Sequence, residues 1–126
     1  MKKIETKDAP VPAGPYSQAI VSGNLVFVSG LIPTDPVSGA IPAGTEEQIR
    51  LVMRNLTAVL SAAGVKKNSV LKVSVYLTDM NDFQLMNSVY KEIFSDPFPA
   101  RTCIGVVSLP KGVKIMTDAV GEINSQ

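Results

Sequence analysis

Apolar and polar residues alternate along the first part of the chain in short runs separated by glycine and proline. Residues 18–22 and 25–29 are two such runs, rich in β-branched and aromatic side chains, and Gly23-Asn24 lies between them. This pattern predicts a β-hairpin with a tight turn. Residues 29–44 are rich in Gly and Pro, and we expect them to form a long loop, which in a small domain is often functional.

Two later segments repeat apolar side chains at helical spacing. In the first, Thr45 is a suitable N-cap with Gln48 three residues later, and Gly64 is a natural stop. The second runs from about residue 81 to 94. Its apolar stripe consists of Phe83, Met86, Val89, Tyr90 and Ile93.

Residues 69–78 change to strict alternation, which predicts a strand. One of its faces carries Leu71, Val73, Val75 and Leu77, and the other carries Lys72, Ser74 and Tyr76. Residues 101–109 and 113–120 predict two more strands joined around residues 110–112. The order β-β-loop-α-β-α-β-β predicts one α+β domain over residues 1–126, with both helices on one face of one sheet. The second face is then solvated or covered by another copy of the chain.

The amino-acid composition limits the classes of protein to which this chain could belong. The chain is 45% hydrophobic and only 18% charged, with a formal net charge of +1, which favours an oligomer of small subunits and argues against a dedicated nucleic-acid binder. One cysteine and no histidine exclude an internal disulfide and the common zinc sites. No secretory signal or membrane-spanning run of ~20 apolar residues is present. We therefore expect a cytoplasmic protein, with an organelle as the alternative.

The segment "PFPARTC" at residues 97–103 holds the most informative pair of side chains. Arg101 and Cys103 are two residues apart in a predicted strand and therefore share a face. Arg101 is either a surface arginine at a strand edge or a fork that binds a carboxylate or phosphate. Cys103 has no histidine to deprotonate it, so packing against a ligand explains it better than nucleophilic catalysis.

Three further positions admit two interpretations each. Tyr16 either anchors its loop or contacts a ligand, and Asn87 either faces solvent or binds one. Gly30 follows a strand, where a glycine lets a ligand approach the backbone closely.

These features occur together in a known family. The chain resembles the Rid (YjgF) family of reactive-intermediate imine/enamine deaminases, and the match runs in order over almost the whole sequence. It is carried by "AGPYSQAI" (13–20), "FVSGLIP" (27–33), "EEQIRLVMRNLTAVLSAAG" (46–64), "VYLTDMNDFQLMNSVYKEIF" (75–94) and "PARTCIGVVSLPKGVKI" (99–115). The resemblance implies a chorismate-mutase-like fold and a homotrimer. The sheets of such a trimer close into a central barrel with the helices outside, and three sites lie between subunits.

The resemblance also assigns site residues. It implies catalytic or binding roles for Arg101 and Cys103, and binding roles for Tyr16, Ser29, Gly30 and Asn87.

The chain departs from the family pattern at two places. Leu31 stands where the family usually has glutamine. Met116 stands where it has a glutamate thought to position or activate the attacking water. The second glutamate of the same strand falls on Asp118. These changes put the reaction in question more than they affect the binding of a carboxylate.

The function implied by the resemblance is hydrolysis of 2-aminoacrylate and 2-iminobutanoate to 2-keto acids and ammonium. Pyridoxal-phosphate dehydratases would supply these substrates, and the protein itself would need no cofactor and no metal. One alternative is a protein that binds keto or imino acids with little turnover. Another is the endoribonuclease or translation-inhibitor activity described for some relatives, which fits poorly with a chain that has no histidine.

Overall fold

A computed structural model describes residues 1–123 and contains a mixed sheet of six strands with two helices. The strands lie side by side in the order β1-β2-β3-β6-β4-β5, and every neighbouring pair is antiparallel except β4–β5. The predicted α+β class with a mixed sheet is confirmed. The elements are β1 (Lys2–Ile4), β2 (Ala19–Ser22), β3 (Leu25–Leu31), α1 (Thr45–Ala62), β4 (Val70–Leu77), α2 (Phe83–Ile93), β5 (Ala100–Gly105) and β6 (Ile115–Glu122).

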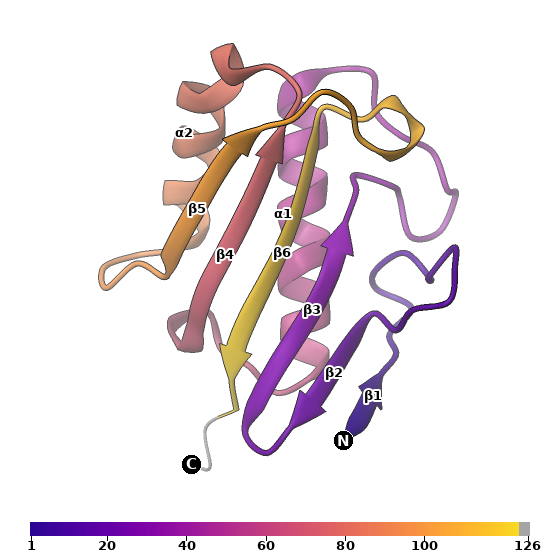
Figure 1. Cartoon of the computed structure of the whole chain (residues 1–126), viewed down its shortest axis with the longest axis vertical. Helices are drawn as coiled ribbons and strands as arrows, with labels where there is room; N and C mark the ends of the chain where they lie inside the picture. Colours follow the sequence, from indigo (N-terminus) through magenta and orange to yellow (C-terminus); the bar gives the residue numbers. More distant parts are fainter. Residues whose placement is uncertain (124–126) are drawn as a thin grey trace.

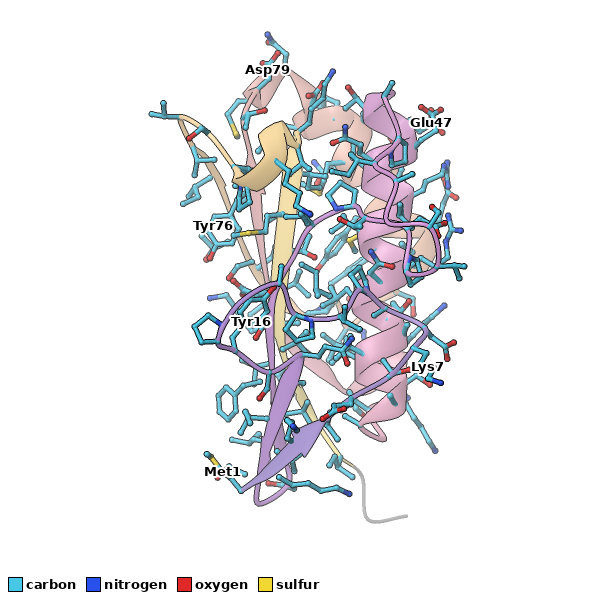
Figure 2. All side chains as sticks on the ribbon, turned by 90° about the vertical axis from the view of Figure 1, so that its right-hand side faces the viewer. Met1, Lys7, Tyr16, Glu47, Tyr76 and Asp79 are labelled. Atoms are coloured by element: carbon cyan, nitrogen blue, oxygen red, sulfur yellow. The ribbon has the colours of Figure 1, made fainter. Side chains whose placement is uncertain are left out.

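Both helices cover the same face of the sheet, as predicted. Figure 1 looks onto the other face, with α1 behind the strands, and Figure 2 shows the same layers from the side. The apolar stripe of α1 is buried against apolar side chains of the central strands, which form one continuous core. Fully buried members of this core include Ile49, Val52, Leu56, Val73 and Ile115.

The face of the sheet away from the helices, called here the open face, carries large apolar side chains. Phe27 on β3 is 46% exposed and Ile104 on β5 is 45% exposed. Half-buried Lys72, Ser74 and Tyr76 of β4 lie on the same face. Apolar groups of this size among polar ones are typical of a surface that contacts another macromolecule.

The start of α1 differs from the prediction. The N-cap is Gly44, and Thr45 is the first helical residue without a side-chain capping bond. The Thr45 hydroxyl instead accepts a hydrogen bond from Lys114 Nζ at 3.0 Å. Gln48 donates to the carbonyl of Pro42 and accepts from the backbone N–H of Lys114, both at 2.8 Å. Tertiary contacts to the loop before β6 therefore take the place of the predicted cap.

The prediction that Leu71 shares a face with Val73, Val75 and Leu77 is wrong. Val70 pairs with Gly121, but the next paired residue, Lys72, lies opposite Val120, so β4 contains a β-bulge between them. A bulge inserts one extra residue and shifts the alternation of side chains. Leu71 is consequently 43% exposed while Val70 is buried, and the predicted alternation holds for the rest of the strand.

Strand boundaries also differ from the prediction, and one short strand was not predicted. The strand predicted over residues 101–109 ends at Gly105, opposite the last residue of β4, Leu77. β4 ends there, so β5 has no further pairing partner, and Val106 donates its N–H to the Leu77 carbonyl as the chain turns away. The final strand starts two residues later than predicted, and the short β1 was not predicted because three residues carry no periodicity. Neither helix in the described part of the chain is long and apolar enough to cross a membrane.

Candidate functional site

Arg101 and Cys103 share the helix-facing side of the edge strand β5. In the parallel pairing with β4, Arg101 lies beside Val73 and Cys103 beside Val75, and both valines are buried in the core. The prediction that the two side chains point the same way is confirmed. Cys103 is partly buried and packs against the core cluster.

The surroundings of Cys103 favour a neutral thiol. Burial raises the pKa of the Cys103 thiol above its ordinary value, and the positive charge of Arg101 opposes this effect only in part. A raised pKa keeps the thiol protonated at neutral pH and makes it a poor nucleophile. The chemistry of this residue therefore agrees with the interpretation of Cys103 as a packing residue.

The Arg101 guanidinium lies against side chains of α2. Its Cζ atom is 4.8 Å from the ring centroid of Tyr90 and 5.6 Å from that of Phe83. Its Nη1 contacts the Met86 sulfur at 3.7 Å. Within residues 1–123, the ion pairs join other cations to carboxylates, and Arg101 takes part in none of them.

The Arg101 side chain lines a hollow of about 430 Å³ at the edge of the molecule between β5 and α2. Asn87 on α2 lines the same hollow, so the structure brings these two predicted site residues together. The walls combine apolar and polar groups, and none of them is a carboxylate. The other lining residues are Tyr90, Lys91, Phe98 and Pro99.

A second hollow, of about 170 Å³, gathers another part of the predicted set. Tyr16, Gly30, Leu31 and Met116 line it, together with Lys111 and residues of the loops nearby. Gly30 lies within a register shift of the β3–β6 pairing, between Val28 and Leu31. A Cβ atom at Gly30 would lie 3.1 Å from the Met116 sulfur. A larger residue at position 30 would therefore crowd the Met116 side chain, whereas glycine leaves room for it.

Ser29 and Tyr16 fix the loop that forms one wall of the second hollow. The Ser29 hydroxyl donates to the Ser17 carbonyl at 2.5 Å, and the Ser29 N–H donates to the Gln18 carbonyl. The Tyr16 hydroxyl accepts a hydrogen bond from the backbone N–H of Ala13 at 3.3 Å, although the residue is 51% exposed. Ser29 therefore holds the loop, and its hydroxyl is already engaged.

Met116 and Asp118 lie on the open face, on the same side of β6, as their spacing predicts. Met116 is opposite Tyr76 and Asp118 is opposite Ser74 in the pairing with β4. Asp118 accepts a hydrogen bond from the Tyr76 hydroxyl at 3.0 Å, and this bond is the main cause that raises the pKa of Tyr76. Figure 2 shows Tyr76 projecting on the side of the sheet opposite α1. Asp118 does not line the hollow that contains Met116.

Within one chain the predicted site residues thus form two separate groups. Arg101, Cys103 and Asn87 lie at the β5 edge on the helix side, whereas Gly30 and Met116 lie on the open face with β4 between them and β5. The two hollows share no lining residue.

Sequence reasoning missed part of the Arg101 surroundings. Phe83, Met86 and Tyr90 were assigned to the core stripe of a helix, and the pattern held no signal that an arginine 11 to 18 residues later would lie on them. The lysines that line the hollows, Lys91 and Lys111, were missed for the same reason. No group of three or more His, Cys, Asp or Glu side chains in the described part of the chain is arranged to hold a metal ion.

Comparison with known proteins agrees with this architecture. Residues 6–123 match the family model described as Endoribonuclease L-PSP. The chain is 51% identical over 118 residues to a RutC family protein of Pyrococcus horikoshii, covering 93% of this chain and 94% of that protein. It is 44% identical over 124 residues to TdcF of Escherichia coli, a candidate reactive intermediate deaminase by name, covering 95% and 96%. It is 40% identical over 122 residues to the 2-iminobutanoate/2-iminopropanoate deaminase of Escherichia coli, covering 94% and 95%.

Solved structures give the same result. The crystal structure of RidA from an Antarctic Psychrobacter superposes with a TM-score of 0.95 at 37% identity, covering 98% of this chain and all of that one. Escherichia coli TdcF with bound serine superposes with a TM-score of 0.94 at 40% identity, covering 98% and 100%. The chain belongs to the Endoribonuclease L-PSP family, which includes the YjgF and Rid proteins.

Proposed function

We propose that this protein hydrolyses small 2-imino and 2-enamine acids to 2-keto acids and ammonium. The observation that carries the proposal concerns Arg101, which has no carboxylate partner among residues 1–123 and lines a hollow with no acidic side chain among its described lining residues. Such a guanidinium is free to bind the carboxylate of a ligand in bidentate fashion. The names of the related deaminases support the same class of reaction.

The chemistry needs few groups from the protein. A protonated 2-imino acid adds water to its C=N carbon, and the resulting carbinolamine loses ammonia to give the keto acid. 2-Aminoacrylate enters the same route after its enamine takes up a proton on carbon. The imine is already electrophilic, so holding it beside one water supplies much of the catalysis. Pyridoxal-phosphate dehydratases are the class of enzyme that would release these substrates.

In this proposal Arg101 binds the carboxylate, and Cys103 forms the adjacent wall as a neutral thiol. Asn87 lines the same hollow and is suited to a polar contact with the ligand. Backbone groups near Gly30 and Cys103 orient the nitrogen and the attacking water. Tyr16 closes the part of the site that contains Gly30.

The proposal includes a homotrimer, with each site between two subunits. Two observations support a neighbouring subunit: the two groups of site residues do not meet within one chain, and the open face exposes Phe27 and Ile104. Light scattering should give about three times the subunit mass of 13.4 kDa. A stable monomer would remove the shared site from consideration.

Met116 supports a second candidate function. If the family glutamate is required to activate water, a methionine at this position leaves carboxylate binding intact and slows or abolishes hydrolysis. The protein would then bind keto or imino acids without significant turnover. RNA cleavage, which the family description names, receives no such support, because the chain has no histidine and a net charge of only +1.

Release of ammonium and keto acid from freshly generated 2-aminoacrylate tests the proposal. Wild type should accelerate the reaction above its spontaneous rate, and Arg101→Ala should remove most of the acceleration. Binding of 2-oxobutanoate without acceleration would favour the binding protein instead. Equal rates with and without wild-type protein, together with no binding, would contradict both functions.

A further inference from the structure

The Arg101 guanidinium is held in place by an aromatic platform from α2. Phe83 and Tyr90 both place their rings within 5.6 Å of its Cζ atom. The two residues are seven apart, with Met86 between them, so all three lie on one stripe of the helix. Phe83 and Tyr90 together form this aromatic platform.

Aromatic rings and a carboxylate differ in how they hold an arginine side chain. A carboxylate would pair with the fork and occupy its N–H groups. A ring face attracts the cation through its quadrupole, and the neighbouring Met86 sulfur is only a weak acceptor. The guanidinium of Arg101 is therefore oriented while its charge and most of its donors remain free for a ligand.

Tyr90 is well suited to this role because it is itself immobile. It is 4% exposed, and its ring packs against that of the buried Phe94 with centroids 4.8 Å apart. Its hydroxyl is buried and has no hydrogen-bond partner in the described part of the chain. An unpaired buried hydroxyl is unfavourable, so the ring rather than the hydroxyl accounts for the position of this residue.

We propose that Phe83 and Tyr90 are positioning residues that orient Arg101 for the carboxylate of the substrate. This inference rests on the proposed function, because it assumes that Arg101 is the carboxylate anchor. It goes further in assigning the preorganisation of that anchor to two ring faces. It also predicts that the Tyr90 hydroxyl is dispensable.

The test compares binding of 2-oxobutanoate to wild type, Tyr90→Phe, Tyr90→Leu and Arg101→Ala by calorimetry or NMR titration. Tyr90→Phe keeps the ring and should bind as wild type does. Tyr90→Leu should weaken binding about 3–30-fold, the range expected for one cation–π contact. The neutral analogue 2-oxobutanamide lacks the carboxylate, and its weaker binding should be the same in all four proteins. General damage to the hollow would reduce binding of both compounds.

Phe83→Leu provides an independent variant, because Phe83 is only half-buried and its replacement disturbs the core less. It should weaken 2-oxobutanoate binding in the same way, and it should raise KM for the imine by a larger factor than it lowers kcat. If Arg101→Ala loses binding while Tyr90→Leu and Phe83→Leu bind as wild type, the platform is refuted and the anchor stands. If Tyr90→Phe loses as much as Tyr90→Leu, the hydroxyl and not the ring acts on the ligand, which also overturns the inference. Equal binding by wild type and Arg101→Ala would overturn the anchor, and with it the platform.

Discussion

Met116→Glu is the substitution that most directly separates the two proposed functions. Met116 lines the smaller hollow beside Gly30, and its sulfur lies close to the Gly30 backbone. A glutamate has nearly the same length, so its carboxylate would enter the space that the methionine sulfur and methyl group occupy. The change introduces the residue type that the family resemblance implies for this position.

The neighbours of the new carboxylate determine its charge and cost. Asp118 lies two residues along the same face of β6, ~7 Å away, where two negative charges repel by about 0.6–2.4 kcal/mol at effective dielectric constants between 80 and 20. This repulsion raises the pKa of the new carboxyl group. Lys111 lines the same hollow and opposes the repulsion. Since Met116 is only half-buried, the substitution should leave the protein folded.

A positioned general base typically contributes ~10²–10⁴-fold to rate. An imine that hydrolyses spontaneously needs only part of this, so Met116→Glu should raise turnover at least several-fold over a weak wild-type activity. The assay follows keto-acid and ammonium release at saturating imine. Met116→Gln is the matched control, because it has the shape of glutamate but cannot take up a proton at neutral pH. Only Met116→Glu should gain activity as pH rises through the pKa of the new carboxyl group, since the base works when deprotonated.

A folded Met116→Glu protein with no gain in turnover would contradict this prediction, because the missing glutamate would then not limit the reaction. An equal gain in Met116→Gln would show that a polar group, and not a base, is what the hollow lacked. Absence of turnover in all three proteins, with intact binding of 2-oxobutanoate, would favour the binding protein. None of these results depends on the aromatic platform under Arg101.

The remaining predictions concern the other predicted site residues. Arg101→Ala should weaken 2-oxobutanoate binding by about 30–1000-fold, equivalent to roughly 2–4 kcal/mol. Arg101→Lys should lose much of the same affinity, because a point charge cannot form the bidentate contact. Calorimetry measures both affinities, and unchanged binding would show that the anchor is misassigned. Cys103→Ser should keep most of the activity. Alkylation of wild-type Cys103 by iodoacetamide should be slow at pH 7, because burial raises the pKa of its thiol. Loss of turnover in a folded Cys103→Ser protein with intact ligand binding would make the thiol catalytic. Asp118→Asn should reduce turnover less than Arg101→Ala does, because Asp118 accepts a hydrogen bond from Tyr76 and does not line the hollow that contains Met116. A loss of turnover as large as that of Arg101→Ala would show that Asp118 takes part in the reaction.

Much of the fold follows from local pattern. Alternation placed Val73, Val75 and Leu77 correctly in the core, and helical spacing gave α1 to within a residue or two. The stop at Gly64, where φ is +88°, and the two-residue turn at Gly23 depended on backbone conformations that glycine adopts easily. Such features are encoded within a few residues, so the sequence alone can reveal them.

Features that depend on pairing between distant segments were missed. The bulge that exposes Leu71 is a property of how β4 meets β6, and strict alternation within one strand gives no sign of it. The cap predicted at Thr45 was lost to a contact with Lys114, 69 residues away. The site shows the same limit: spacing predicted that Arg101 and Cys103 share a face, but not which rings would lie beneath the guanidinium.

The residues around both hollows restrict the chemistry that the proposed site could perform. The chain has no histidine, burial raises the pKa of the Cys103 thiol, and among the residues that the structure describes no aspartate or glutamate lines either hollow. Proton transfers would then pass through water, backbone groups, or the phenol and ammonium groups that line the hollows, which belong to Tyr16, Tyr90, Lys91 and Lys111. A site of this composition is poorly suited to an unreactive amide or phosphodiester, whose cleavage requires a strong nucleophile or a well-placed acid. It can accelerate a reaction whose substrate is already electrophilic and carries a negative charge by which it can be held. A protonated 2-imino acid meets both conditions, and for this reason the arginine, rather than a nucleophile, is the residue on which the proposed function depends.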